Sequence, residues 1–84
     1  MEHDAFLQAV RARLKSYVIE QRGAEIPAYV RMRGPGDDVI SLYLDEREEE
    51  IAAITPDQLT DEKVGVFVAQ GQDYMDRKIA ELYG

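Results

Sequence analysis

Apolar residues recur at intervals of three and four along the first quarter of the chain, which is the spacing of one face of a helix. Asp4 precedes this stripe as a helix cap, and Gly23 follows it as a helix stop. The pattern predicts a helix over residues 5–22. Its apolar face consists of Phe6, Leu7, Val10, Leu14, Tyr17 and Val18, and its outward face of Gln8, Arg11, Lys15 and Arg22.

Two later segments, residues 28–33 and 39–45, alternate between apolar and polar positions with the period of a strand. The sequence RGPGDD between them is rich in the residues that turns require. We therefore expect a β-hairpin. Its core face would carry Ala28, Val30, Met32, Ile40, Leu42 and Leu44, and its outer face Tyr29, Arg31, Arg33, Val39, Ser41 and Tyr43.

The segment DEREEE, residues 45–50, is followed by four largely apolar residues that fit either a third strand or one short helix. Glutamate and alanine favour the helix, whereas like charges one turn apart oppose it. A turn followed by a strand is slightly favoured and would make a three-stranded meander. Thr55, Pro56 and Gln58 then have the order of a helix start with a capping box.

The last 24 residues, DEKVGVFVAQGQDYMDRKIAELYG, fit two structures. Residues 64–69 have the alternation of a strand, which would leave a shorter helix over residues 72–83. A single helix over residues 60–83 accounts for more positions and is favoured, because one stripe then runs along its whole length. That stripe is Val64, Phe67, Val68, Gly71, Met75, Ile79 and Leu82.

Together these elements predict one α+β domain over residues 1–84, in the order α-β-β-(β)-α, with an antiparallel hairpin or three-stranded meander packed against two helices. A chain of this length buries only about 60 to 65% of its unfolded surface, so its core is small. A helix of 24 residues spans about 35 Å, which is longer than a small sheet can cover. Part of its stripe is therefore expected to stay uncovered.

Charge is distributed unevenly along the chain. The net charge is −7, yet residues 1–33 carry six basic against four acidic side chains, and residues 34–84 carry four basic against thirteen acidic ones. Cysteine is absent, which excludes disulfides and thiolate sites. Acidic residues stand where a secretory signal is basic, and no apolar run reaches the roughly 18 residues of a membrane span. We expect a cytoplasmic protein that does not enter a membrane.

Motifs of catalysis or cofactor binding do not emerge from the remaining residues. The single histidine, His3, stands near the start of the chain, where a side chain is poorly positioned. Ser16 and Ser41 have no general base available to make either of them a nucleophile. Glycines 34 and 36 lack the spacing of a phosphate loop, and the acidic segments lack that of a calcium loop. The sequence predicts no enzyme, no cofactor and no metal site.

The densest charge is acidic and lies in the middle of the chain, at Asp37, Asp38, Asp45, Glu46, Glu48, Glu49 and Glu50, with Asp57, Asp61 and Glu62 following. Such a surface attracts a partner protein with a basic surface and repels nucleic acid. In composition the chain resembles small acidic proteins that inhibit nucleic-acid-binding machinery, including phage inhibitors of restriction and of CRISPR systems. The resemblance implies an inhibitor or adaptor; the alternative is charge that only keeps the protein in solution.

Two further surfaces are candidates for contact. Tyrosine and arginine dominate binding hot spots, so the outer hairpin face with Tyr29, Arg31, Arg33 and Tyr43 is one of them. The other is the uncovered end of the last helix, at Met75, Ile79, Leu82 and Tyr83, which would let two copies pair as a homodimer through this helix and a sheet edge. The leading prediction is a non-enzymatic protein-binding module, and the alternative is a self-associating structural or assembly protein.

Overall fold

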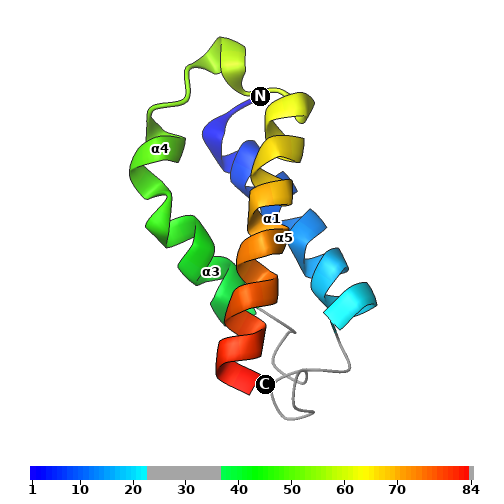
Figure 1. Cartoon of the computed structure of the whole chain (residues 1–84). Coiled ribbons are helices and arrows are strands. Elements are labelled where there is room, and N and C mark those ends of the chain that lie inside the picture. Colours follow the sequence, from blue (N-terminus) through cyan, green and yellow to red (C-terminus); the bar gives the residue numbers. More distant parts are fainter. Residues whose placement is uncertain (23–36, 84) are drawn as a thin grey trace.

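Every regular element in residues 1–22 and 37–83, the two ranges that the computed structural model describes, is helical (Figure 1). The elements in chain order are α1 (His3–Tyr17), the π-helical turn η1 (Val18–Arg22), α3 (Asp37–Glu46), α4 (Glu48–Ala52), the 3-10 turn η3 (Pro56–Gln58) and α5 (Asp61–Tyr83). They account for 88% of the described residues. The α+β prediction is therefore wrong, and the protein is a small helical domain.

The second predicted strand, residues 39–45, lies within α3. Val39, Ile40, Tyr43 and Leu44 are buried, which is the spacing of a helix face, whereas Leu42 is 46% exposed. Strand geometry would have placed Leu42 in the core beside Ile40 and Leu44. The first predicted strand, with Tyr29, Arg31 and Arg33, lies outside the described residues.

The acidic segment, by which we mean residues 45–50, forms the end of α3, a one-residue turn at Arg47 and the start of α4. The prediction of a turn followed by a third strand is wrong, and the short-helix alternative is confirmed. Glutamate has a high helix propensity, and its side chains here point to solvent, where like charges repel one another only weakly. The first hydrogen bond of α4 runs from the Ile51 backbone N–H to the Arg47 carbonyl, at 2.9 Å.

The N-terminal helix confirms the predicted stripe. Phe6, Val10, Leu14 and Val18 are buried, and the helical path continues through η1 to Arg22. The start differs from the prediction, because Glu2 occupies the cap position and Asp4 lies in the first turn. A carboxylate in that position still interacts favourably with the helix dipole.

The predicted capping box at Thr55 and Gln58 is present, but it starts the turn η3 rather than the long helix. The Thr55 backbone N–H donates to Gln58 Oε1 at 3.4 Å. The chain then buries Leu59, and Thr60 Oγ1 accepts the Lys63 N–H at 3.3 Å at the start of α5. Two successive caps therefore separate α4 from α5.

The C-terminal segment is one continuous helix, which confirms the helical interpretation of residues 64–69. The predicted stripe faces the core from Val64 to Ile79, and only its last member, Leu82, is exposed, at 56%. The expected uncovered end of the stripe is therefore a single residue.

Both α1 and α3 pack against α5, which runs along the length of a molecule measuring 40 × 18 × 18 Å (Figure 1). The three helices come close together at Gly71, where a Cβ atom would lie 2.8 Å from both Cδ atoms of Leu14 and 3.0 Å from Tyr43 Cε2. Phe6 and Phe67 join the α1 and α5 faces edge to face, with ring centres 5.4 Å apart. The core is thus built from all three helices, and no two of them enclose it alone.

Candidate functional site: an acidic segment beside an open groove

Five carboxylates are exposed along the acidic segment, at Asp45, Glu46, Glu48, Glu49 and Glu50. Within the described part of the chain, none of them lies within 4.0 Å of a basic side-chain nitrogen. Because they sit on helical backbone, their spacing is fixed rather than that of a loose loop. The segment therefore presents dense, uncompensated negative charge on an ordered scaffold.

Arg47, the one basic residue of the segment, does not neutralise this charge. Its guanidinium carbon lies 5.0 Å from the centre of the Tyr43 ring, a cation–π arrangement directed toward the interior. The Arg47 side chain is half-buried, and its Nε has no hydrogen-bond partner. The arginine thus packs on Tyr43, the residue through which α3 contacts α5.

Tyr43 itself is fully buried and was predicted wrongly as part of an exposed sheet face. Its hydroxyl donates to the Phe67 carbonyl of α5 at 2.6 Å, and burial raises the pKa of that hydroxyl. The helical backbone of α3 turns this residue toward α5, where a strand would have turned it outward. Tyr43 is therefore a structural residue, and Arg47 and Tyr74 pack against it.

Tyr74 continues this contact on α5. Its ring centre lies 5.3 Å from that of Tyr43, and the Lys78 ammonium lies 5.8 Å from the Tyr74 ring. Burial raises the pKa of Tyr74 to about 12, and interaction with the Glu46 carboxylate adds to the shift. Glu46 is therefore the member of the acidic segment that is linked to the core.

An open groove of about 450 Å³ lies beside the acidic segment, between α1 and the pair α3–α4. One wall is a single face of α1, which contributes three residues spaced four apart, and the other wall is formed by α3 and α4 together. The lining is His3, Leu7, Arg11, Leu44, Asp45, Glu48, Ile51 and Ala52. Two carboxylates of the acidic segment, those of Asp45 and Glu48, therefore belong to the groove as well.

Two hydrogen bonds cross from the α1 wall of this groove to the opposite side. His3 Nε2 donates to the Ile54 carbonyl at 3.0 Å, and Arg11 Nη1 donates to Ser41 Oγ at 3.2 Å. His3 and Arg11 are two helical turns apart, about 12 Å along the axis. These bonds join α1 to the α3–α4 side at both ends of the groove.

The other predicted contact residues are dispersed. Asp38 is exposed near the start of α3, whereas the side chains of Asp37 and Tyr83 lie outside the described part. Met75 and Ile79 are 0% and 1% exposed and belong to the monomer's own core, so they do not form the uncovered stripe that was predicted for self-association. Leu82 remains exposed without either of them beside it at the surface.

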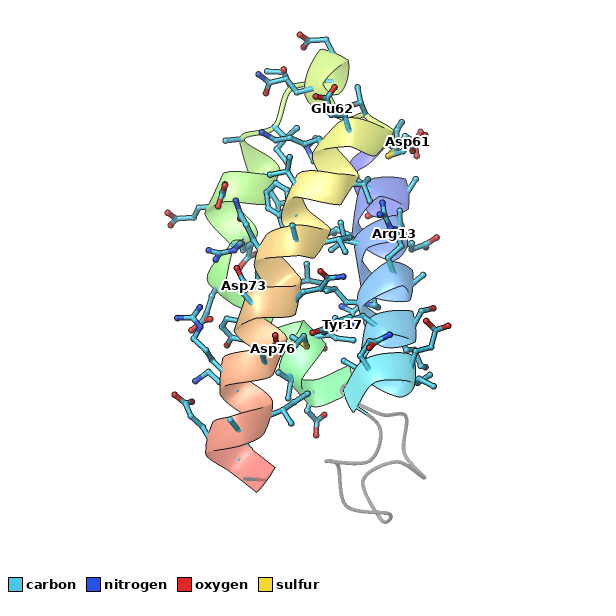
Figure 2. All side chains as sticks on the ribbon, turned by 45° about the vertical axis from the view of Figure 1, so that its right-hand side comes forward. Arg13, Tyr17, Asp61, Glu62, Asp73 and Asp76 are labelled. Carbon is cyan, nitrogen blue, oxygen red and sulfur yellow. The ribbon has the colours of Figure 1, made fainter. Side chains whose placement is uncertain are left out.

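Acidic residues also surround the start of α5, where Asp61 and Glu62 are exposed in the first turn (Figure 2). This is the positive end of the helix dipole, so the dipole stabilises both carboxylates. Further along the same helix, Asp76 accepts a 2.7 Å hydrogen bond from the Tyr17 hydroxyl of α1 (Figure 2). These acids thus support the fold, in contrast to the acidic segment.

The two described ranges contain neither a cluster of metal ligands nor a membrane-spanning helix. No group of three or more histidine, aspartate or glutamate side chains there is arranged to hold a metal ion. Among the helices of residues 1–22 and 37–83, none is long and apolar enough to cross a membrane.

Comparisons of the chain with protein-family models, curated proteins and solved structures found no match. The candidate site therefore stands on its own geometry. Sequence reasoning selected the acidic segment but missed the groove. The signal for the groove was the spacing of His3, Leu7 and Arg11, which places a basic, an apolar and a basic residue on one helix face beside the core stripe.

Proposed function

We propose that this protein is a non-enzymatic protein-binding module that uses the acidic segment to bind a basic surface of a partner protein. The observation that carries the proposal is the set of five exposed carboxylates within six residues, none of them paired with a basic side chain of the described chain. Arg47 strengthens it, because the only cation in the segment is directed at Tyr43.

The physical reason is electrostatic. Charges fixed on helical backbone keep their spacing on binding, so little conformational entropy is lost when a partner's lysines and arginines approach. A concentrated negative field also accelerates the encounter with a positive surface and disfavours a negative one. The partner surfaces that carry such positive charge include those that hold nucleic acid, so the protein would act as a competitor of nucleic acid, as an inhibitor or adaptor.

The test is charge reversal of Glu48, Glu49 and Glu50 to lysine, compared with a matched variant in which Glu20, Asp57 and Asp73 are changed to lysine. Both variants alter the net charge equally, and all six positions are exposed. Surface substitutions of this kind change stability by about 0.5 kcal/mol each. Both variants should therefore fold.

The three proteins are used as bait in extracts of the native cell, and captured proteins are then purified and titrated. A specific partner should bind the wild type and the Glu20, Asp57 and Asp73 variant with similar affinity, and should bind the Glu48–Glu50 variant more than about tenfold more weakly. Salt should release the partner, since exposed charges are screened beyond about 8 to 10 Å at ordinary ionic strength. Nucleic acid that the partner holds should compete. Equal binding of the two lysine variants would show that net charge alone acts, and the proposal would then fail.

A further inference from the structure

We propose that the groove between α1 and α3–α4 receives one large apolar side chain of the partner, flanked there by lysine or arginine residues that pair with Asp45 and Glu48. This inference rests on the proposed function, because it assigns the contact point of the same basic partner. It goes further in requiring an apolar anchor as well as positive charge.

The chemistry of the lining supports an anchor of this kind. Leu44 and Ile51 are 6% and 5% exposed and form an apolar floor that is closed from below by the core, whereas Leu7 is partly buried on the opposite wall. The volume of about 450 Å³ exceeds what one leucine or phenylalanine side chain fills. A partner side chain placed there would remove the remaining apolar surface of the floor from water, which is favourable in proportion to the area buried.

The charges of the rim select the neighbours of that anchor. Asp45 and Glu48 are exposed on the α3–α4 rim and are not paired with a basic side chain of the described chain. The cation on the opposite rim, Arg11, already donates to Ser41. The two rims therefore differ, and a bound segment with basic residues next to its anchor is expected to place them on the acidic side.

The length of the groove limits the size of the bound segment. His3 and Arg11, the first and last lining residues of α1, lie about two helical turns apart, about 12 Å, which is the reach of three or four extended residues or two turns of helix. One anchor with its immediate neighbours fits this span. Hot spots of protein interfaces commonly have this form, with a buried side chain in a pocket surrounded by polar contacts.

The experiment uses the full chain, labelled with ¹⁵N, and three synthetic peptides of about ten residues. The first has one leucine flanked by lysines, the second replaces that leucine with serine, and the third keeps the leucine and replaces the lysines with glutamates. Amide chemical-shift changes give the place of binding, and their dependence on peptide concentration gives the affinity. The inference predicts shifts at the groove, with the first peptide binding about tenfold more tightly than either control.

Two pairs of variants separate the groove from general charge attraction. Ala52→Trp fills the groove from an exposed lining position, and Ala53→Trp adds the same ring at the next residue, which does not line it. Glu48→Gln removes a lining carboxylate, and Glu49→Gln removes an exposed one outside the lining. Ala52→Trp should weaken binding of the leucine peptide several-fold more than Ala53→Trp does, and Glu48→Gln several-fold more than Glu49→Gln does.

The outcomes distinguish this inference from the proposed function. If the serine peptide binds as tightly as the leucine peptide, and the Glu48–Glu50 lysine variant loses both, the acidic segment binds cations and the anchor site is wrong. If none of the peptides shifts the groove resonances, the anchor site is wrong whatever the captured partner shows. If dilution of the free protein alone moves the groove resonances, a second copy of the chain fills the groove, and the inference is likewise overturned.

Discussion

The guanidinium of Arg47 faces the ring of Tyr43 at 5.0 Å, although five carboxylates surround it in sequence. The one-residue turn between α3 and α4 directs the Arg47 side chain toward Tyr43, while its acidic neighbours are exposed. Arg47 thus packs on Tyr43, and because its cation is directed at that ring it is not paired with the carboxylates of the acidic segment. This arrangement separates the stability of the domain from its proposed binding activity.

Replacement of Arg47 by glutamine should lower the free energy of unfolding by about 1 to 2 kcal/mol, because a partly desolvated cation–π contact is lost. Arg77→Gln, at an exposed position of α5, is the control and should change stability by no more than about 0.5 kcal/mol. Urea denaturation at pH 7 measures both. Equal midpoints for the two variants would contradict the role assigned to Arg47.

Gly71 and Gly65 provide a matched pair on the same helix. Gly71→Ala places a methyl group 2.8 Å from both Cδ atoms of the buried Leu14, and should lower stability by about 1 to 3 kcal/mol. Gly65→Ala meets nothing within 4 Å and should raise stability by up to about 1 kcal/mol, the difference in helix propensity. Thermal and chemical denaturation would reveal opposite shifts, whereas stabilisation by both changes would exclude a tight contact at Gly71.

The raised pKa of Tyr74 makes stability depend on alkaline pH. Between pH 10, the ordinary value for tyrosine, and about 12, the value in the folded protein, the unfolded chain binds fewer protons than the folded one. The associated stability is therefore fully present below pH 10 and is lost as pH rises to about 12. Two pKa units correspond to about 2 to 3 kcal/mol.

Tyr74→Phe should make stability fall less steeply with pH over this range, and ultraviolet titration should lose one late-titrating phenol. Tyr17, half-buried and hydrogen-bonded to Asp76, is not a suitable control, so the comparison is between wild type and Tyr74→Phe at matched pH values. An unchanged slope between pH 10 and 12 would contradict the assignment.

Met75 and Leu82 test whether α5 associates with a second copy. Met75→Asp places a carboxylate in the monomer's core and should unfold the domain, whereas Leu82→Asp alters an exposed position and should leave it folded. Circular dichroism measures folding, and sedimentation measures mass. A wild-type dimer that becomes a folded monomer on Leu82→Asp would support association through this end of α5, and a monomeric wild type would exclude it.

The sequence predicts the two long helices because each stripe extends over more than three turns. Over residues 6–18 and 64–79, the period of three and four has no competitor once the whole window is considered. The same argument fails in α3. Its seven residues from Val39 to Asp45 satisfy period two and helical spacing alike, and the β-branched residues at the start of this stretch favour the strand.

The decisive residue in α3 is Leu42. A strand assigns it to the core, and a helix assigns it to the surface, where an isolated leucine is common and carries little penalty. Extending the helical spacing from Ile40 and Tyr43 to Arg47 and Ile51 would have predicted the helix pair. The structure agrees with that spacing, since Ile51 is buried one turn further along. The spacing of His3, Leu7 and Arg11 marks one wall of the groove, but the groove itself could not have been predicted, since it depends on where α1 lies against α3 and α4.

The packing of α1 on α5 also has a consequence for how the chain folds. α1 and α5, which pack extensively against each other, are the first and last helices of the described chain, and the hydrogen bond between Tyr17 and Asp76 spans 59 residues. The bond from His3 to Ile54, just after α4, spans 51 residues. Closing such loops costs entropy before any contact repays it, so folding should be slower than for helical domains with mainly local contacts. On the ribosome, the apolar stripe of α1 cannot pack against α5 until α5 has emerged. Until then the apolar stripe of α1 is exposed to non-native apolar contacts.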